Sequence, residues 1–372
     1  MPVGVLCILF VVFLIIAIPV GITLGITAVL PHLFDPSFTV GAKYLIRAMF
    51  GGLDSFPLLA VPMFVLSGII MAKGGISRKI FDVFAYFFGR FTAGMPCAVI
   101  VTCLFYGAIS GSAPATVAAV GSMTAPILIG LGYDKTFTTS VVAVAGGLGV
   151  IIPPSIPFIM YGMASGASVS NLFLAGVIPG LVIAALLMGY AIFYCKKNGE
   201  DRVRIEAEIG KLHERGFGKV FKDSFWALLS PIIVLGCIYS GITSPTEAAV
   251  ISVYYALIVS LFIYKEIKFR DLWGILVEAI KTFTPILFIL AASTAFSRVL
   301  TLMQVPQEVS SFILGNFSNK IIILLVINAF LLLVGMVMDT TPAILILTPI
   351  LLPIAQGIGM DSIQFGVIMV VN

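Results

Sequence analysis

The chain has 372 residues, of which 60% are hydrophobic and only 10% charged, and its formal net charge is +4. Soluble globular proteins carry about 25% charged residues, so a mean hydropathy of +1.16 excludes that class and predicts an integral membrane protein. The apolar runs lack alternation, which predicts transmembrane helices rather than barrel strands. The two histidines and five cysteines are scattered, so neither a metal cluster nor a disulfide framework is expected.

The first half of the chain, residues 1–195, predicts a series of helices. Residues 3–33 form an uncharged run interrupted at Pro19, which predicts either two short helices or one kinked helix, and no cleavable signal peptide. The elements expected next are an amphipathic helix near 39–50, a span at 55–72, a basic interfacial segment at 73–90, a hairpin at 93–131, a broken helix at 134–168 and a connecting span at 171–195.

The segment 196–223 is the most polar part of the chain, with eight Lys/Arg and six Asp/Glu. Its mixed charge argues against nucleic-acid binding and predicts a surface-lying linker helix. The second half, 224–372, repeats the order of the first. Its expected elements are spans at 226–241 and 246–264, an amphipathic segment at 269–282, a span at 283–303, an interfacial piece at 304–319, a hairpin at 320–357 and an incomplete last helix from Asp361.

Two segments share an unusual pattern: GAISGSAPA from Gly107 aligns without a gap on GMVMDTTPA from Gly335. Glycine and proline weaken or break helices, and broken backbone at membrane depth is tolerated only inside protein or beside a wet cavity. We therefore expect two re-entrant hairpins, with SGSAP and DTTP at their tips. A further break is expected in GGLGVIIPPS, residues 146–155.

Charge predicts the orientation of the chain in the membrane. If the 196–223 linker is cytoplasmic, 17 of the 21 basic residues lie on that side, as the positive-inside rule requires. The first hairpin then enters from the cytoplasm and the second from outside. The halves are thus expected to be inverted-topology repeats, an arrangement that lets one site face alternate sides. By the same repeat, a second proline break is expected beyond Asn372.

The helix ends at the two tips are expected to attract ions of opposite charge. The return helices are predicted to start at Pro114 and Pro342, a favoured first position, with Ser112 and Thr341 as the nearest capping hydroxyls. The N-terminal ends of these helices favour an anion. The C-terminal ends of the outgoing helices present free carbonyls that can hold Na⁺. One motif can therefore bind an acid together with its coupling cation.

These tip residues also have a simpler, structural reading. A carboxylate such as Asp339 costs about 2.5–3.5 kcal/mol at the centre of a span, so it usually has an ion or a partner; the alternative is a solvated aspartate at the tip. Glu247 follows Ser-Pro-Thr as a first-turn helix acid and is expected to be structural. The tip hydroxyls could simply cap their own helices or pack at helix crossings: Ser110, Ser112, Thr340 and Thr341.

Four segments together resemble one family over nearly the whole chain. They are SGSAPAT at 110–116, GGLGVIIPPSIPFIMYG at 146–162, SGITSPTEAAV at 240–250 and GMVMDTTPAILILTPILLPIA at 335–355. In these the chain resembles the large membrane subunit of the tripartite ATP-independent periplasmic (TRAP) transporters, the DctM-like or SiaM-like members of the ion transporter superfamily. Members of that family continue into a second proline-pair motif.

The resemblance implies an elevator-type, sodium-driven transporter of the bacterial inner membrane that imports an organic acid such as sialic acid or a C4-dicarboxylate. The implied partners are a small four-helix membrane subunit of the Q type and a periplasmic substrate-binding protein, and at least two Na⁺ are expected as the only metal. The first implied sodium site comprises Ser110, Ser112, Gly146, Gly149 and Pro153. The second comprises Gly335, Asp339, Thr340 and Thr341. The implied substrate site, between the tips, comprises Ser112, Ser155 and Asp339.

Three other classes of membrane protein are the alternatives to a TRAP transporter subunit. An ion channel could also use re-entrant loops, but it predicts a filter-like run of the TVGYG type, which the sequence lacks. A stand-alone divalent-anion/sodium symporter would use similar tips without partner subunits. A membrane enzyme would need a catalytic constellation or a phosphate-binding GxxxxGK[ST], and neither is found, so ATP is not expected as a direct energy source. We therefore predict a transporter subunit that is not an enzyme and has no organic cofactor.

Overall fold

The computed structural model describes residues 3–34, 38, 41–317, 319–336 and 338–372. Over these residues the chain is entirely helical, without strands, which confirms the predicted all-α class. Seven of the described helices are long and apolar enough to cross a membrane. The chain is therefore a multi-pass membrane protein in its architecture.

The chain divides into two compact units, which we name after the hairpin that each contains. The hairpin-1 unit comprises Ala60–Ile156 and Phe173–Ala279. The hairpin-2 unit comprises Met1–Leu59, Pro157–Leu172 and Ile280–Asn372.

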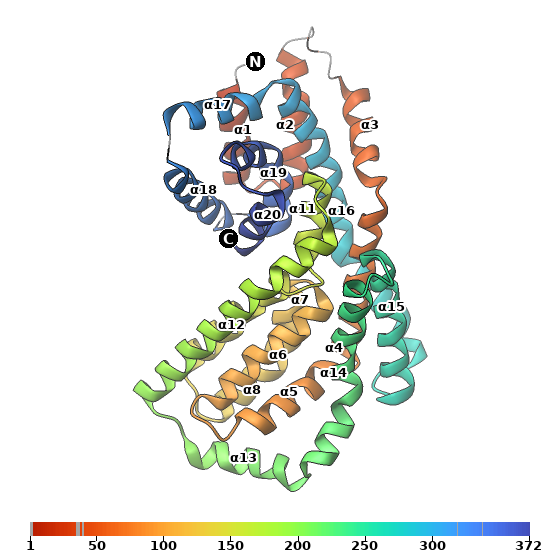
Figure 1. Ribbon diagram of the computed structural model, residues 1–372. Helices are drawn as coiled ribbons and strands as arrows, with labels where there is room; N and C mark the ends of the chain where they lie inside the picture. The colour runs from red at the N-terminus through yellow and green to blue at the C-terminus, as the bar shows by residue number, and fades with distance from the viewer. Residues whose placement is uncertain (1–2, 35–37, 39–40, 318, 337) are drawn as a thin grey trace. The chain divides into compact units, whose positions relative to one another are not determined.

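The hairpin-1 unit holds the first tip and the polar linker (Figure 1). Its elements are α4 (Ala60–Lys73), α5 (Ile76–Phe88), α6 (Gly94–Ser110), α7 (Ala113–Thr116), the π-helix η2 (Val117–Gly121), α8 (Ser122–Gly130), α9 (Lys135–Gly146), α10 (Leu148–Ile151), most of α12 (Val169–Asn198), α13 (Arg202–Glu214), α14 (Phe217–Tyr239), α15 (Pro245–Ile258), the π-helix η3 (Val259–Ile263), the 3₁₀-helix η4 (Phe269–Asp271) and the start of α16 (Leu272–Leu302).

Helix α6 is the centre of the hairpin-1 unit, because it contacts α4, α5, α9, α10 and α14. Its Tyr106 is fully buried and donates a hydrogen bond of 2.8 Å to the carbonyl of Gly68 in α4. Helix α4 packs closely along α15, where the buried hydroxyls of Ser67 and Ser252 lie 2.6 Å apart. Small residues and buried hydroxyls of this kind allow close helix packing in a membrane. They make α4, α6 and α15 a firm support for the first tip.

The hairpin-2 unit holds the second tip. Its elements are α1 (Val3–Ile15), α2 (Val20–Phe34), α3 (Ala42–Leu53), the 3₁₀-helix η1 (Phe56–Leu59), α11 (Ile156–Ser165), the remainder of α16, α17 (Val305–Asn316), α18 (Lys320–Gly335), α19 (Thr340–Gly357) and α20 (Ser362–Val371). Of the two alternatives for residues 3–33, the structure has two helices, α1 and α2, which contact each other. Helix α19 lies against α17, α18 and α20, and the Tyr161 hydroxyl of α11 donates to the carbonyl of Ser362, 2.6 Å away, at the start of α20.

Two predicted boundaries differ from the structure. The segments expected separately at 269–282 and 283–303 belong to one helix, α16, which continues through Pro285. Proline is tolerated inside a transmembrane helix because neighbouring groups can satisfy the freed carbonyl. The 196–223 linker is also not a single helix: it comprises the end of α12, all of α13 and the start of α14. Helix α12 ends at Asn198, and Asp201 caps α13 by accepting a hydrogen bond from the Arg204 amide.

Glu247 has the structural role expected of it. It forms a capping box with Ser244 at the start of α15: the Ser244 hydroxyl accepts from the Glu247 amide, and a Glu247 oxygen accepts from the Ser244 amide at 2.7 Å. This arrangement satisfies two otherwise unpaired amide groups at the helix start.

We expect Ser244→Ala to lower the free energy of unfolding by about 1 kcal/mol, as the loss of a helix cap does elsewhere. Thermal unfolding in mild detergent would measure the change. Ser240→Ala is the matched control, because the exposed Ser240 hydroxyl makes no bond to a helix N-terminal amide within the described part of the chain; it follows α14 and donates to the carbonyl of Cys237 at 3.2 Å. Equal loss in the two variants would contradict the assigned role of the capping box.

Candidate functional site

Oxygen atoms converge at the first hairpin tip. The Ser110 hydroxyl lies 3.0 Å from the Thr116 hydroxyl, and the latter donates to the Ser112 carbonyl at 2.8 Å. Ser110 and Thr116 are buried, and the chain turns between them because Gly111 adopts a left-handed conformation, with φ of 63°. Glycine adopts this conformation without a steric penalty. We call the Ser110 and Thr116 hydroxyls and the Ser112 carbonyl the tip-1 oxygen cluster.

The tip is joined to the break in the helix that follows the hairpin. The amide of Ile156, after the break, donates to the carbonyl of Gly111 at 3.1 Å. A Cβ on Gly111 would lie 2.7 Å from the Pro154 carbonyl oxygen, so the two chain segments meet backbone to backbone. The buried Ser155 hydroxyl donates to the carbonyl of Val150 and thereby caps the end of α10. The first tip and the proline break thus form one connected turn structure.

Glycines bring α6 and α10 together below the tip. A Cβ on Gly107 would lie 2.5 Å from the Cα of Gly149, and one on Gly149 would lie 3.0 Å from the Ser112 carbonyl oxygen. Gly146, one turn earlier, faces the side chain of Val117 in the same way. The close approach therefore places the helix break directly against the tip-1 oxygen cluster.

The structure brings together most of the predicted first sodium site. Ser110, Ser112 and Gly149 share one small region with the buried break at Pro153, and Gly146 lies one turn away. Sequence reasoning missed Thr116, whose hydroxyl contributes one of the three oxygens. Its position four residues after Ser112 is a usable signal, because residues at this spacing share a helix face. The return helix α7 starts at Ala113 with Ser112 as its N-cap, one residue before the predicted Pro114.

The second tip has a different local structure. Helix α18 ends at Gly335, and α19 starts at Thr340 with Asp339 as its N-cap, not at the predicted Pro342. Asp339 is exposed, and among the described residues its carboxylate makes no capping hydrogen bond. Thr341 is buried in the first turn. The carboxylate is therefore not occupied by its own helix.

Gly335 lies against the end of α20, where a Cβ would sit 3.4 Å from the carbonyl oxygen of Asn372. The side-chain amide nitrogen of Asn372 donates at 2.6 Å to the side-chain oxygen of Asn328 in α18. Sequence reasoning missed both asparagines. The position of Asn328 could have predicted this contact. It is a polar residue within the apolar run of α18, and such residues commonly make hydrogen bonds between transmembrane helices. Asp339, the third predicted substrate residue, belongs to the hairpin-2 unit, whereas Ser112 and Ser155 belong to the hairpin-1 unit.

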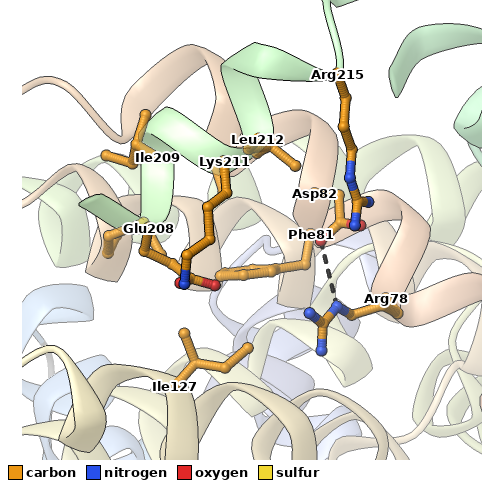
Figure 2. A pocket seen from close by; sticks show the side chains of 11 residues that line it. Arg78, Phe81, Asp82, Ile127, Glu208, Ile209, Lys211, Leu212 and Arg215 are labelled. Carbon is orange, nitrogen blue, oxygen red and sulfur yellow. Dashed lines mark hydrogen bonds and ion pairs between the residues drawn. The ribbon is translucent and has the colours of Figure 1, made fainter. Parts of the chain in front are cut away.

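A charged cavity of about 110 Å³ lies away from the tips, between α5, α8 and α13 (Figure 2). Its lining contains three cations and two carboxylates: Arg78, Lys211, Arg215, Asp82 and Glu208. Two of the cations are already paired, Arg78 with Asp82 at 3.3 Å and Lys211 with Glu208 at 3.0 Å. Burial raises the pKa of Asp82, and the Arg78 charge opposes this effect. The pairing leaves the cavity without a strong preference for an anion.

The family model of the DctM component of tripartite ATP-independent periplasmic transporters matches residues 7–372. The chain belongs to this family. It is 40% identical over its whole length to the isethionate TRAP transporter permease protein DctMQ of Oleidesulfovibrio alaskensis, of which it spans 57%.

Two further relatives support the same assignment. The chain is 37% identical to the C4-dicarboxylate TRAP transporter large permease protein DctM of Pseudomonas aeruginosa, over 94% of this chain and 80% of that protein. It is 35% identical to the 2,3-diketo-L-gulonate TRAP transporter large permease protein YiaN of Escherichia coli, over 89% of this chain and 76% of that protein. The resemblance seen in the four sequence segments is thereby confirmed: the chain is a TRAP large permease.

Proposed function

We propose that this DctM-family chain is the transport subunit of a sodium-coupled importer of an organic acid. The tip-1 oxygen cluster is the observation that carries the proposal. Two buried hydroxyls and a carbonyl converge there, beside a broken helix whose glycines bring its backbone close. Unwound backbone and helix ends of this kind hold Na⁺ in secondary transporters. The residues that would hold the first ion are Ser110, Ser112, Thr116, Gly149 and the break at Pro153.

The second ion is assigned to the turn between α18 and α19. The exposed Asp339 carboxylate would offset part of the cost of dehydrating a cation, and Gly335, Thr340 and Thr341 would supply backbone or hydroxyl oxygens. At least two coupling ions are proposed, one for each tip. No chemistry at an enzyme active site and no organic cofactor form part of this proposal.

The substrate is proposed to be an anion with a carboxylate or sulfonate group. The three relatives carry isethionate, C4-dicarboxylate and 2,3-diketo-L-gulonate in their names, and all three are organic anions. In this chain the half-buried Ser112 hydroxyl and the start of α7 would receive the acid group, because helix N-termini favour anions. Ser155 would contribute by holding the break in place. Sialic acid is the other substrate class that the family resemblance implies.

The proposal includes the assembly and the mode of transport. A small Q-type membrane subunit and a periplasmic substrate-binding protein would complete the transporter in the bacterial inner membrane. The isethionate relative is named as a DctMQ protein, and a separate Q subunit is our proposal for this chain. Inverted repeats and a cytoplasmic 196–223 linker are proposed from the repeated sequence pattern and the charge bias. An elevator-type movement is proposed because the family resemblance implies it.

Sodium-dependent uptake by the reconstituted three-component system provides the test. One net charge moved down about 100 mV contributes roughly 2.3 kcal/mol, or about 50-fold accumulation. If two or more Na⁺ enter with a monoanion, uptake of a labelled acid should be electrogenic and should stop when choline replaces Na⁺. The same vesicles without the binding protein are the control. Uptake that persists in choline would refute sodium coupling.

A further inference from the structure

A buried carboxylate lies at the base of the first hairpin, far along the chain from its tip. The Glu200 side chain, between α12 and α13, is only 3% exposed. One of its oxygens, Oε1, accepts hydrogen bonds from the Ala93 amide at 3.0 Å and from the Tyr133 hydroxyl at 2.6 Å. The other, Oε2, forms an ion pair with Arg202 at 3.1 Å. A buried charge is retained only where such partners offset the loss of water.

The partners of Glu200 belong to the two feet of the hairpin. Ala93 is the N-cap of α6, the outgoing helix, and Tyr133 follows α8, the last part of the return helix. Arg202 adds two bonds to the same outgoing foot, to the Arg90 carbonyl at 3.2 Å and the Thr92 hydroxyl at 2.8 Å. One ion pair at the start of the linker therefore holds both feet of the hairpin.

The outgoing foot has an unusual backbone that suits this contact. Ala93 adopts a left-handed conformation, with φ of 59°, which is uncommon for a residue other than glycine. Such conformations persist only where the surroundings determine them. Burial and the hydrogen bond to Glu200 raise the pKa of Tyr133, which keeps its hydroxyl protonated as a donor.

Helix α13, which follows Glu200, packs against the helices of the hairpin-1 unit. Ile205 and Ile209 are buried in the core that α6, α8, α9 and α12 share. A Cβ on Gly89, at the end of α5, would lie 2.6 Å from the Cδ1 atom of Ile209, so this glycine makes room for the linker. Ile209 and Leu212 of α13 line the charged cavity together with Phe81 and Ile127 (Figure 2). Helix α13 of the polar linker therefore packs against the hairpin-1 unit through one apolar face.

We propose that Glu200 is a positioning residue that fastens both feet of the first hairpin to the linker, so that hairpin and linker move as one body. The consequence for transport rests on the proposed function: a hairpin fixed at its base would keep the tip-1 oxygen cluster in register with the helix break. A merely stabilising Glu200 would lower the stability of the whole unit without a local effect at the feet.

Hydrogen–deuterium exchange of the full chain in lipid nanodiscs separates these possibilities. Glu200→Ala should speed exchange in peptides covering both feet, 89–97 and 128–134, by roughly tenfold or more, the loss expected for a buried charge-assisted hydrogen bond. Tyr133→Phe, a milder change, should act mainly on the 128–134 foot. Peptides around Ser67 and Ser252 should exchange at the wild-type rate in both variants.

Glu208→Ala is the matched control. Glu208 lies in the same linker, within α13, but its side chain is 46% exposed and pairs with the exposed Lys211. An exposed pair of this kind contributes little, so exchange at the feet should not change. The proposal is overturned if folded Tyr133→Phe and Glu200→Ala leave the feet unchanged. It is also overturned if exchange rises equally throughout the unit, including the peptides around Ser67.

Sodium-dependent uptake provides a second measurement, which distinguishes failure of the proposed function from failure of the role proposed for Glu200. In the reconstituted system, Glu200→Ala should raise the sodium concentration needed for half-maximal uptake several-fold, whereas Glu208→Ala should leave it unchanged. If the wild-type protein shows no sodium dependence, the proposed function fails while the exchange data still decide the role of Glu200. If exchange confirms that Glu200 holds both feet but the sodium requirement is the same in both variants, the proposed effect of Glu200 on the tip-1 oxygen cluster is wrong.

Discussion

Replacing Gly107 with valine should sharply weaken sodium-coupled uptake by protein that still inserts and folds. The new Cβ would lie 2.5 Å from the Cα of Gly149, and a backbone atom cannot move aside as a flexible side chain can. Overpacking costs about 1–3 kcal/mol. Here it would separate α6 from α10 and pull the Ser112 carbonyl away from the break. We expect the sodium requirement to rise about 5- to 150-fold, the equivalent of that cost in binding.

Uptake against sodium at saturating substrate measures this effect, with exchange or thermal unfolding to verify folding. Gly189→Val in α12 is the matched control, since it also places valine in a transmembrane helix. No described atom outside the helix lies within 4 Å of the Gly189 Cβ position. If both variants raise the sodium requirement alike, the close approach of α6 and α10 does not support the site. An unchanged requirement in Gly107→Val would also contradict the assignment.

Much of the architecture was predictable, because the apolar composition of transmembrane helices identifies them in the sequence. Long apolar runs must be helices in a bilayer, since every backbone group needs an internal partner. The repeated pattern coincides with the turns between α6 and α7 and between α18 and α19. The aspartates that follow mark helix starts: Asp134 accepts from the Phe137 amide and Asp361 from the Ile363 amide. Such caps follow from local sequence alone.

Features that depend on packing were not predictable in this way. Helix α19 starts at Thr340 with Pro342 inside its first turn, where the missing N–H costs no hydrogen bond, and α16 continues unbroken through Pro285. The polar linker illustrates the limit more sharply. Its composition predicts a solvated surface, yet Glu200 is buried, because its partners at Ala93 and Tyr133 are far away in sequence. Long-range pairs of this kind cannot be read from a local pattern in a single sequence.

Asp339→Asn should raise the sodium concentration required for uptake by roughly 10- to 150-fold, since a hydrogen bond or contact to a charged group contributes about 1.5–3 kcal/mol. The substitution keeps the shape of the side chain and removes its charge. Asparagine is as good an N-cap as aspartate, so α19 should still begin at Thr340. Among the described residues the carboxylate makes no capping bond that could be lost. The expected effect is therefore on the ion and not on the fold.

Asp361→Asn is the control that makes this prediction specific. Asp361 is also the N-cap of a helix in the hairpin-2 unit, but its carboxylate accepts from the Ile363 amide at 2.7 Å and is thereby occupied by its own helix. The same chemical change there should leave both folding and the sodium requirement near those of the wild type. Ser112→Ala, at the other tip, should instead raise the substrate concentration needed at saturating sodium. If Asp339→Asn folds normally and its sodium dependence matches that of Asp361→Asn, the Asp339 carboxylate is a solvated tip residue and the second ion lies elsewhere.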